Sequence, residues 1–145
     1  MIMKYDSIDQ ILEANDRMSE RLKTVVEGIA EERRSIIPDG EKWSINHIVE
    51  HLAMVEHSMT RICAKLLGKA ESAGTASAGI SVSENFIQKG AELAGIKVKA
   101  PEIVEPTGTQ SIEDSFAKME ACREAFHGLR QQFETNDGSS FTFPH

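Results

Sequence analysis

Two histidines spaced four residues apart are the side chains in this sequence best suited to chemistry. They are His47 and His51, which stand in KWSINHIVEHL beside the only tryptophan of the chain. On a helix, side chains four residues apart lie on one face, with about 5–6 Å between their Cβ atoms, so both imidazoles can reach one ion. The spacing therefore suggests a divalent metal site, with His51 as a ligand and His47 as a nearby helper.

Each of these residues also has a purely structural interpretation. His51 points towards the apolar side of its helix and can be a hydrogen-bonded core histidine, whereas His47 follows Ser44 by three residues and can belong to a helix cap. The letters HIVEH also spell the inverted zincin motif, in which Glu50 would be a general base. Because no cluster of further ligands follows in this short chain, we do not favour a peptidase. His57 falls on the opposite side of the helix and is predicted to be a solvated surface residue.

Amphipathic helices are the elements predicted to position these residues. Ser7 to Gln10 form a capping box that begins a first helix, which Pro38 must end near residues 35–37. Ser44 is the expected N-cap of a second helix that runs to Gly68, and Ser111 begins a third. The apolar stripes contain Ile11, Met18, Leu22, Val25 and Ile29, then Ile48, Leu52, Val55, Met59, Ile62 and Leu66, then Ile112, Phe116, Met119, Phe126 and Phe133.

The connections complete an all-α domain over residues 1–145, an up-down helix bundle with three long helices. Residues 69–81 are small and polar and are predicted to be a mobile linker. A short helix is expected over 83–95, with Phe86, Ile87 and Leu93 towards the body. Residues 97–108 contain two prolines and read as an extended crossover strap rather than a strand.

Composition excludes several classes of function. A net charge of −7 argues against nucleic-acid binding, which normally requires a basic face. The sequence has no apolar run of membrane-spanning length and does not begin with the apolar core of a signal peptide, so we expect no membrane partner and a cytoplasmic location. Cys63 and Cys122 lack a CxxC spacing and are predicted to be free buried thiols.

Three segments of the chain resemble the DinB/YfiT-like family of four-helix-bundle proteins. KWSINHIVEHLAMVE looks like the segment with W-S and H-L that opens the family's second helix. The strap APEIVEPTG, followed by a helix with Arg123, is similar to the region before and within the third helix. FTFPH is similar to the segment that leads into the fourth helix.

This resemblance implies a metal-dependent activity. In the family, the histidine of the H-L pair and two histidines of an H-x-x-x-H on the fourth helix hold zinc or nickel, and members of known activity are transferases or isomerases that use low-molecular-weight thiols. Only His51 matches this ligand set, because the sequence stops at His145, where the fourth helix would begin. Two functions stay open: a metal-dependent thiol-transferase-type enzyme with an incomplete site, or a non-catalytic bundle that binds a small ligand or a protein.

The apolar stripes also predict an assembly. Stripes phased for four helices leave one apolar groove uncovered when only three helices are present. We therefore expect a homodimer, in which a neighbour's helix, its segment 83–95 or its aromatic tail with Phe141 and Phe143 fills the groove.

Overall fold

The computed structural model describes residues 5–77, 79 and 84–143, without the side chains of residues 84–87. Its elements are α1 (Ile8–Glu27), α2 (Glu31–Arg34), α3 (Ile45–Ser72), α4 (Glu84–Leu93), the 3-10 turn η1 (Glu102–Val104), α5 (Ile112–Gly128) and α6 (Arg130–Thr135). Within these described ranges there is no β-strand, so the expectation of an all-α fold is confirmed.

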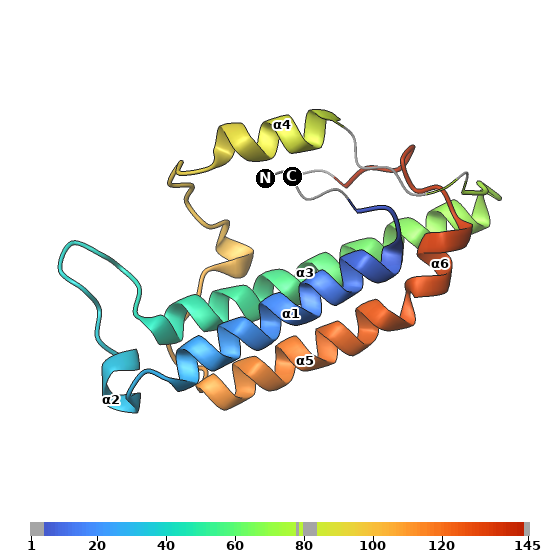
Figure 1. The fold of residues 1–145 in the computed structure, drawn as a ribbon. Helices are drawn as coiled ribbons and strands as arrows, with labels where there is room; N and C mark the ends of the chain where they lie inside the picture. Colours follow the sequence, from blue (N-terminus) through green and yellow to red (C-terminus); the bar gives the residue numbers. More distant parts are fainter. Residues whose placement is uncertain (1–4, 78, 80–83, 144–145) are drawn as a thin grey trace.

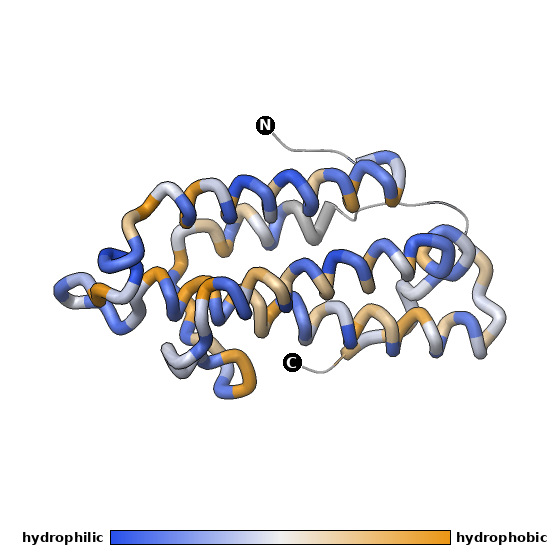
Figure 2. Tube along the Cα trace, turned by 90° about the horizontal axis from the view of Figure 1, so that it is seen from below, coloured by the Kyte–Doolittle hydropathy of each residue, from blue (hydrophilic) through white to orange (hydrophobic). Residues whose placement is uncertain are grey.

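The three long helices α1, α3 and α5 lie alongside one another (Figure 1). The order of colours in Figure 1 shows that α3 and α5 run in the same direction and that α1 runs against them. The predicted up-down order is therefore wrong for α3 and α5, because the long crossover of residues 97–108 returns the chain to the starting end of α3 before α5 begins. The most extensive contact between elements joins α3 to α5, whereas α1 packs mainly on α5 and α6. Figure 2 shows hydrophilic and hydrophobic residues recurring within the turns of the helices, as expected for amphipathic helices.

Serine caps set the beginning of all three long helices, as predicted. Each cap side chain accepts a hydrogen bond from the backbone N–H three residues further on; the caps are Ser7, Ser44 and Ser111. At α1 the side chain of Gln10 reaches back to the backbone N–H of Asp6 at 2.8 Å, one residue earlier than a capping box would place it. Local side-chain chemistry therefore fixes where the helices start.

The ends of two helices differ from the prediction. The first helix stops at Glu27 rather than at residues 35–37, because Gly28 caps it and the separate turn α2 follows. Arg34 donates from Nη2 to the carbonyl of Glu27, the last residue of α1, at 3.4 Å, and from Nε to the carbonyl of Ile29 at 2.9 Å. The second helix continues past Gly68 to Ser72, so the first four residues of the predicted linker 69–81 are helical. The mobility of that linker stays a prediction.

The buried face of α3 differs from the one predicted. The core cluster lies where α1, α3 and α5 meet and consists of Val26, Val49, Ala53, Ile112 and Met119. On α3 the predicted stripe is therefore out of phase: Val49 is fully buried, whereas Met59 is 50% exposed. Small residues such as Ala53 allow α3 and α5 to approach closely, and the larger apolar side chains are left on the neighbouring face.

The other predicted apolar residues have mixed outcomes. Ile112 and Met119 are buried as expected, and Phe126 stacks on Phe133 with 5.8 Å between ring centroids. On α1, Met18 and Val25 are exposed, contrary to the prediction, because the buried side of that helix carries Ile8, Leu12 and Val26. The predicted short helix exists as α4, but Leu93 is 58% exposed instead of facing the body, and the side chains of Phe86 and Ile87 lie outside the described residues.

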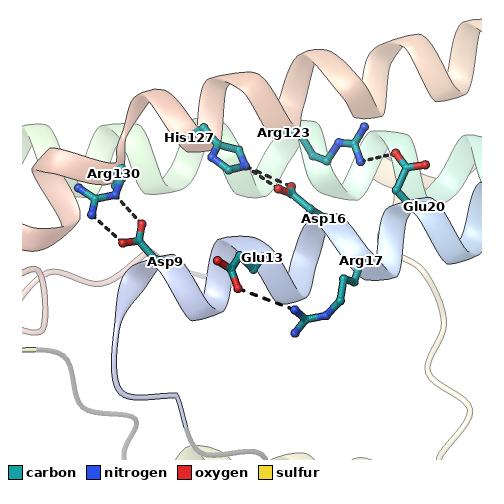
Figure 3. Close-up of polar contacts among 8 residues, drawn as sticks. All are labelled: Asp9, Glu13, Asp16, Arg17, Glu20, Arg123, His127 and Arg130. Carbon is teal, nitrogen blue, oxygen red and sulfur yellow. Dashed lines mark hydrogen bonds and ion pairs between the residues drawn. The ribbon is translucent and has the colours of Figure 1, made fainter.

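A row of ion pairs joins α1 to α5 and α6 (Figure 3). Asp9 accepts two hydrogen bonds from Arg130, Asp16 lies 2.9 Å from Nε2 of His127, and Glu20 lies 3.0 Å from Arg123. Acidic residues of α1 thus face basic residues of the later helices. These pairs are largely exposed, so they orient α1 more than they stabilise it.

The crossover from α3 to α5 is held at both ends of the bundle. Residues 97–108 cross as an irregular segment with the turn η1, which contacts α3, so the predicted strap without a partner strand is seen in the described residues. At the opposite end an isolated β-bridge pairs Ala76 with Asn136, and Thr75 donates its hydroxyl to the carbonyl of Asp137 at 2.9 Å.

Candidate functional site

The first turns of α3 form a polar site with the strap. Glu50 is only 4% exposed, and its carboxylate accepts three hydrogen bonds. The donors are the backbone N–H of Thr107 at 3.0 Å, the hydroxyl of Thr107 at 2.8 Å and the backbone N–H of Gly108 at 2.8 Å. A buried carboxylate with this many donors is a structural anchor, because each donor satisfies an oxygen that water cannot reach.

The same contacts decide the protonation of Glu50. Burial raises the pKa of its carboxyl group, but the hydrogen bonds from Thr107 and Gly108 outweigh burial and leave the pKa below its ordinary value. Glu50 is therefore ionised with its oxygens occupied. A general base needs a free oxygen close to a reacting proton, so the arrangement does not fit the role that the inverted zincin motif gives to this residue.

His47 belongs to the cap of α3. Its Nδ1 accepts a hydrogen bond from the backbone N–H of Ser44 at 3.3 Å and lies 2.8 Å from the Ser44 hydroxyl. The structural interpretation of His47 as a cap partner is thus seen in the structure. With Nδ1 as an acceptor, the neutral ring carries its proton on Nε2, so His47 has no free nitrogen lone pair to offer an ion.

His51 is oriented differently. Its Nδ1 lies 2.7 Å from the carbonyl oxygen of Val104 in η1, and its ring lies against Trp43 with 4.9 Å between centroids. A carbonyl only accepts, so Nδ1 must donate, and the neutral ring keeps its lone pair on Nε2. Ligand histidines in metal sites usually have this arrangement, in which one nitrogen donates to a carbonyl and the other binds the ion.

The described residues nevertheless supply an incomplete donor set for a metal. They contain no group of three or more histidine, cysteine or carboxylate side chains placed to share an ion. Structural and catalytic zinc sites use at least three protein ligands. His57 is exposed, as predicted, and His127 is engaged by Asp16. His51 alone has the geometry of a ligand, and it fits a metal site only if other ligands come from outside the described residues.

A second candidate site is a groove of about 410 Å³ between the three long helices, which we call the central groove. Most of its lining is apolar, and three methionines contribute to it. The apolar residues are Leu12, Met18, Leu22, Leu52, Val55, Met59, Met119 and Phe126. Several of these residues belong to the stripes predicted from sequence. That a fourth helix or a second copy would fill this groove stays a prediction.

Sequence reasoning missed the polar residue that distinguishes the central groove. Glu56 of α3 is half-buried and lines the groove, and burial raises the pKa of its carboxyl group although Arg123 acts in the opposite direction. Within the described residues its carboxylate has no hydrogen bond or ion pair, because the guanidinium of Arg123 donates to Glu20. The signal available in the sequence was a carboxylate flanked at i−1 and i+3 by residues of the apolar stripe, Val55 and Met59.

The two cysteines are free thiols, as predicted. Cys122 is buried and lines the central groove, whereas Cys63 is only half-buried. Burial raises the pKa of both thiols, and the carboxylate of Glu56 raises that of Cys122 further. A thiol with a raised pKa forms little thiolate at neutral pH, so neither cysteine has the character of a nucleophile.

Comparisons with known proteins add no family to this description. A scan of protein-family models, a search of curated proteins and a search of solved structures each found no match to this chain. Among the described residues, no helix combines the length and the apolar character needed to cross a bilayer.

Proposed function

We propose that this chain is a DinB-like helical bundle of the metal-dependent type, in which His51 is one protein ligand of a divalent zinc or nickel ion. The observation that supports this proposal is the hydrogen bond from Nδ1 of His51 to the carbonyl of Val104, which leaves the Nε2 lone pair for an ion. The remaining ligands would come from outside the described residues. His47 contributes to this site through the cap of α3 and its closeness to Glu50, rather than as a ligand.

The activity that fits this proposal is the transfer of a group to or from a low-molecular-weight thiol. A bound divalent ion would lower the pKa of a coordinated thiol, so that thiolate forms near neutral pH. The chain's own residues would do the positioning: Val104 and Trp43 hold the imidazole of His51, and Glu50 holds the strap that carries the Val104 carbonyl. Cys63 and Cys122 do not take part, because burial keeps both protonated.

Metal titration followed by NMR of the histidine rings tests this proposal. We expect the His51 ring to show the tautomer protonated at Nδ1 and to be the first ring perturbed by Zn²⁺ or Ni²⁺. His51→Ala should abolish the metal response, whereas His57→Ala, on the exposed side of the same helix, should leave it unchanged. A metal response that survives in His51→Ala, or the opposite tautomer at His51, would rule the proposal out.

A second candidate function is a non-catalytic bundle that uses the central groove to bind a small ligand or a neighbouring chain. The exposed Met18 and Met59 on its walls support this alternative, because they leave apolar surface uncovered. The predicted homodimer belongs to this function. Light scattering distinguishes a small ligand from a neighbouring chain as the occupant of the groove. A molecular mass that stays at 16.0 kDa as the protein is concentrated favours a small ligand, and a doubled mass indicates a second copy.

A further inference from the structure

The charges around the central groove are paired, with one exception. Asp16 lines the groove but is held by His127 at 2.9 Å, and Arg123 donates to Glu20 at 3.0 Å. Glu56 is the carboxylate in this lining that has no hydrogen bond or ion pair within the described residues. Burial raises the pKa of Glu56, and Arg123 opposes this only from a distance, because its guanidinium is hydrogen-bonded to Glu20. A ligand that supplies a positive charge would give the half-buried carboxylate a direct partner.

The rest of the lining fits the body of such a ligand. The volume of about 410 Å³ lies in the range of small-molecule sites, which is roughly 300–1,000 Å³. Met18, Met59 and Met119 provide flexible walls that adapt to an apolar group. With Asp16 held by His127 and Arg123 by Glu20, the Glu56 carboxylate is the charge of the lining that has no direct pair among the described residues, and the chain as a whole carries a charge of −7. This balance favours a cation over an anion.

From these observations we propose that the central groove binds a small organic cation, with its apolar body between the methionines and its ammonium group on the Glu56 carboxylate. This inference rests on the second candidate function, the use of the groove for binding, and it names the chemical class of the ligand. The aromatic tail FTFPH of a second copy is a poorer occupant, because it carries no lysine or arginine and would bury Glu56 without an ammonium or guanidinium partner.

Three probes with an eight-carbon chain and different head groups test the proposal: octylamine, octan-1-ol and octanoate. Their binding is followed by NMR of ¹³C-labelled methionine methyl groups. Three of the six methionines line the groove, so their methyl signals report the place of binding as well as its strength. We expect octylamine to shift Met18, Met59 and Met119 and to bind about tenfold more tightly than octan-1-ol, with octanoate weakest.

Glu56→Gln keeps the shape of the side chain and removes its charge. We expect this variant to bind octylamine about tenfold more weakly and octan-1-ol as before. The matched control is Glu13→Gln on α1, a residue that is 70% exposed at its side chain and lies outside the groove lining; it should leave all three affinities unchanged.

Each adverse outcome has a distinct meaning. Equal affinity for octylamine and octan-1-ol, or no effect of Glu56→Gln on octylamine, overturns the proposal of a cation and leaves a binding groove. If none of the three probes shifts the methyl signals of the groove methionines, both the proposal and the second candidate function are overturned. If their signals instead depend on protein concentration alone, the groove belongs to a second copy of the chain. The metal titration of His51 is independent of every one of these results.

Discussion

Two glutamates of α3 have opposite surroundings: Glu50 lies at the end that contacts the strap, and Glu56 lines the central groove. At the strap, the buried carboxylate of Glu50 receives three hydrogen bonds. In the groove, the carboxylate of Glu56 receives none among the described residues, and Met59 beside it is half exposed. The polar groups at the strap are satisfied by hydrogen bonds within the chain, whereas the groove leaves a carboxylate and apolar surface that a ligand could contact.

The number of hydrogen bonds that a polar side chain makes distinguishes residues that stabilise the fold from residues that are available to bind a ligand. A satisfied, buried polar group costs stability when it is removed, because its former partners are left without hydrogen bonds. An unpaired polar group and exposed apolar side chains cost little when they are changed. Substitutions in the two regions should therefore differ strongly in their effect on the free energy of unfolding.

The largest difference should appear between two methionines. Met119 of α5 is 4% exposed and belongs to the core cluster, whereas Met59 of α3 is 50% exposed in the groove. We expect Met119→Ala to lower the free energy of unfolding by about 3 kcal/mol, because it leaves a cavity, and Met59→Ala to lower it by less than about 1 kcal/mol. Urea unfolding followed by circular dichroism measures both. Equal losses would mean that the groove is covered in solution.

Removal of the strap anchor should have the next largest effect. Glu50→Ala leaves the backbone N–H groups of Thr107 and Gly108 without their acceptor, and we expect a loss of about 2–3 kcal/mol. Glu13→Ala removes a glutamate that is 70% exposed and should stay within about 0.5 kcal/mol of the wild type. The same urea titration compares them, and a loss at Glu50 no larger than that at Glu13 would show that the strap is not anchored there.

Gly108 provides a test of how closely the strap approaches α3. Its φ of +76° disfavours any other residue, and a Cβ atom at this position would overlap the imidazole of His47. Gly40 has a similar φ of +78° but open space around it. We expect Gly108→Ala to cost about 2 kcal/mol and Gly40→Ala about 1 kcal/mol, since only the first adds a steric clash. Thermal unfolding of the pair checks this, and equal costs would contradict the contact with His47.

The ionisation of Glu50 predicts a pH dependence of smaller size. Its pKa in the folded chain lies below its ordinary value, so the carboxylate stabilises the fold fully above the unfolded pKa of about 4.3. This contribution declines as the pH falls from there through the folded pKa. The difference in unfolding free energy between wild type and Glu50→Gln should therefore be constant from neutral pH to about pH 5 and shrink below about pH 4. A difference that grows on acidification would refute the assignment.

The smallest effect is expected at the row of ion pairs between α1 and α5. Glu20 is 64% exposed at its side chain and pairs with Arg123 at 3.0 Å. Glu20→Gln should change the unfolding free energy by less than about 1 kcal/mol, and less still in 1 M salt, because water and ions screen such pairs.

The same variant frees the guanidinium of Arg123 near Glu56, so octylamine should bind Glu20→Gln more weakly than the wild type. Unchanged octylamine binding would mean that Arg123 does not compete for Glu56.

Local features of the sequence predicted where the helices start, but the buried face of α3 depends on packing against residues far away in the sequence. Ser7, Ser44 and Ser111 cap their helices through contacts three residues away, which a sequence displays directly. Which face of α3 is buried depends on α5. The side with Val49 and Ala53 packs there, although the neighbouring side carries larger apolar residues. A count of apolar residues cannot choose between two adjacent faces of a helix.

The candidate site shows the same division. The sequence identified His51 as the histidine with an inward position and His57 as a surface residue, and it left the cap interpretation of His47 open. Glu50 as the strap anchor was not predictable, since its partners lie 57 and 58 residues further along the chain. Glu56 was missed because a carboxylate beside an apolar stripe is usually solvated, and only the arrangement of α1 and α5 around it leaves it half-buried.

The parallel course of α3 and α5 has a consequence for how this chain folds. The two helices with the most extensive contact are not neighbours in sequence, since α4 and the strap come between them. Their ends must therefore be brought together before the core gains its stability, which costs loop-closure entropy at the start of folding. The bridge of Ala76 with Asn136 and the anchor of Glu50 on Thr107 close this long excursion at opposite ends. We therefore expect the folding rate to depend more on the contacts of Ala76 with Asn136 and of Glu50 with Thr107 than on the helix propensity of α3 or α5.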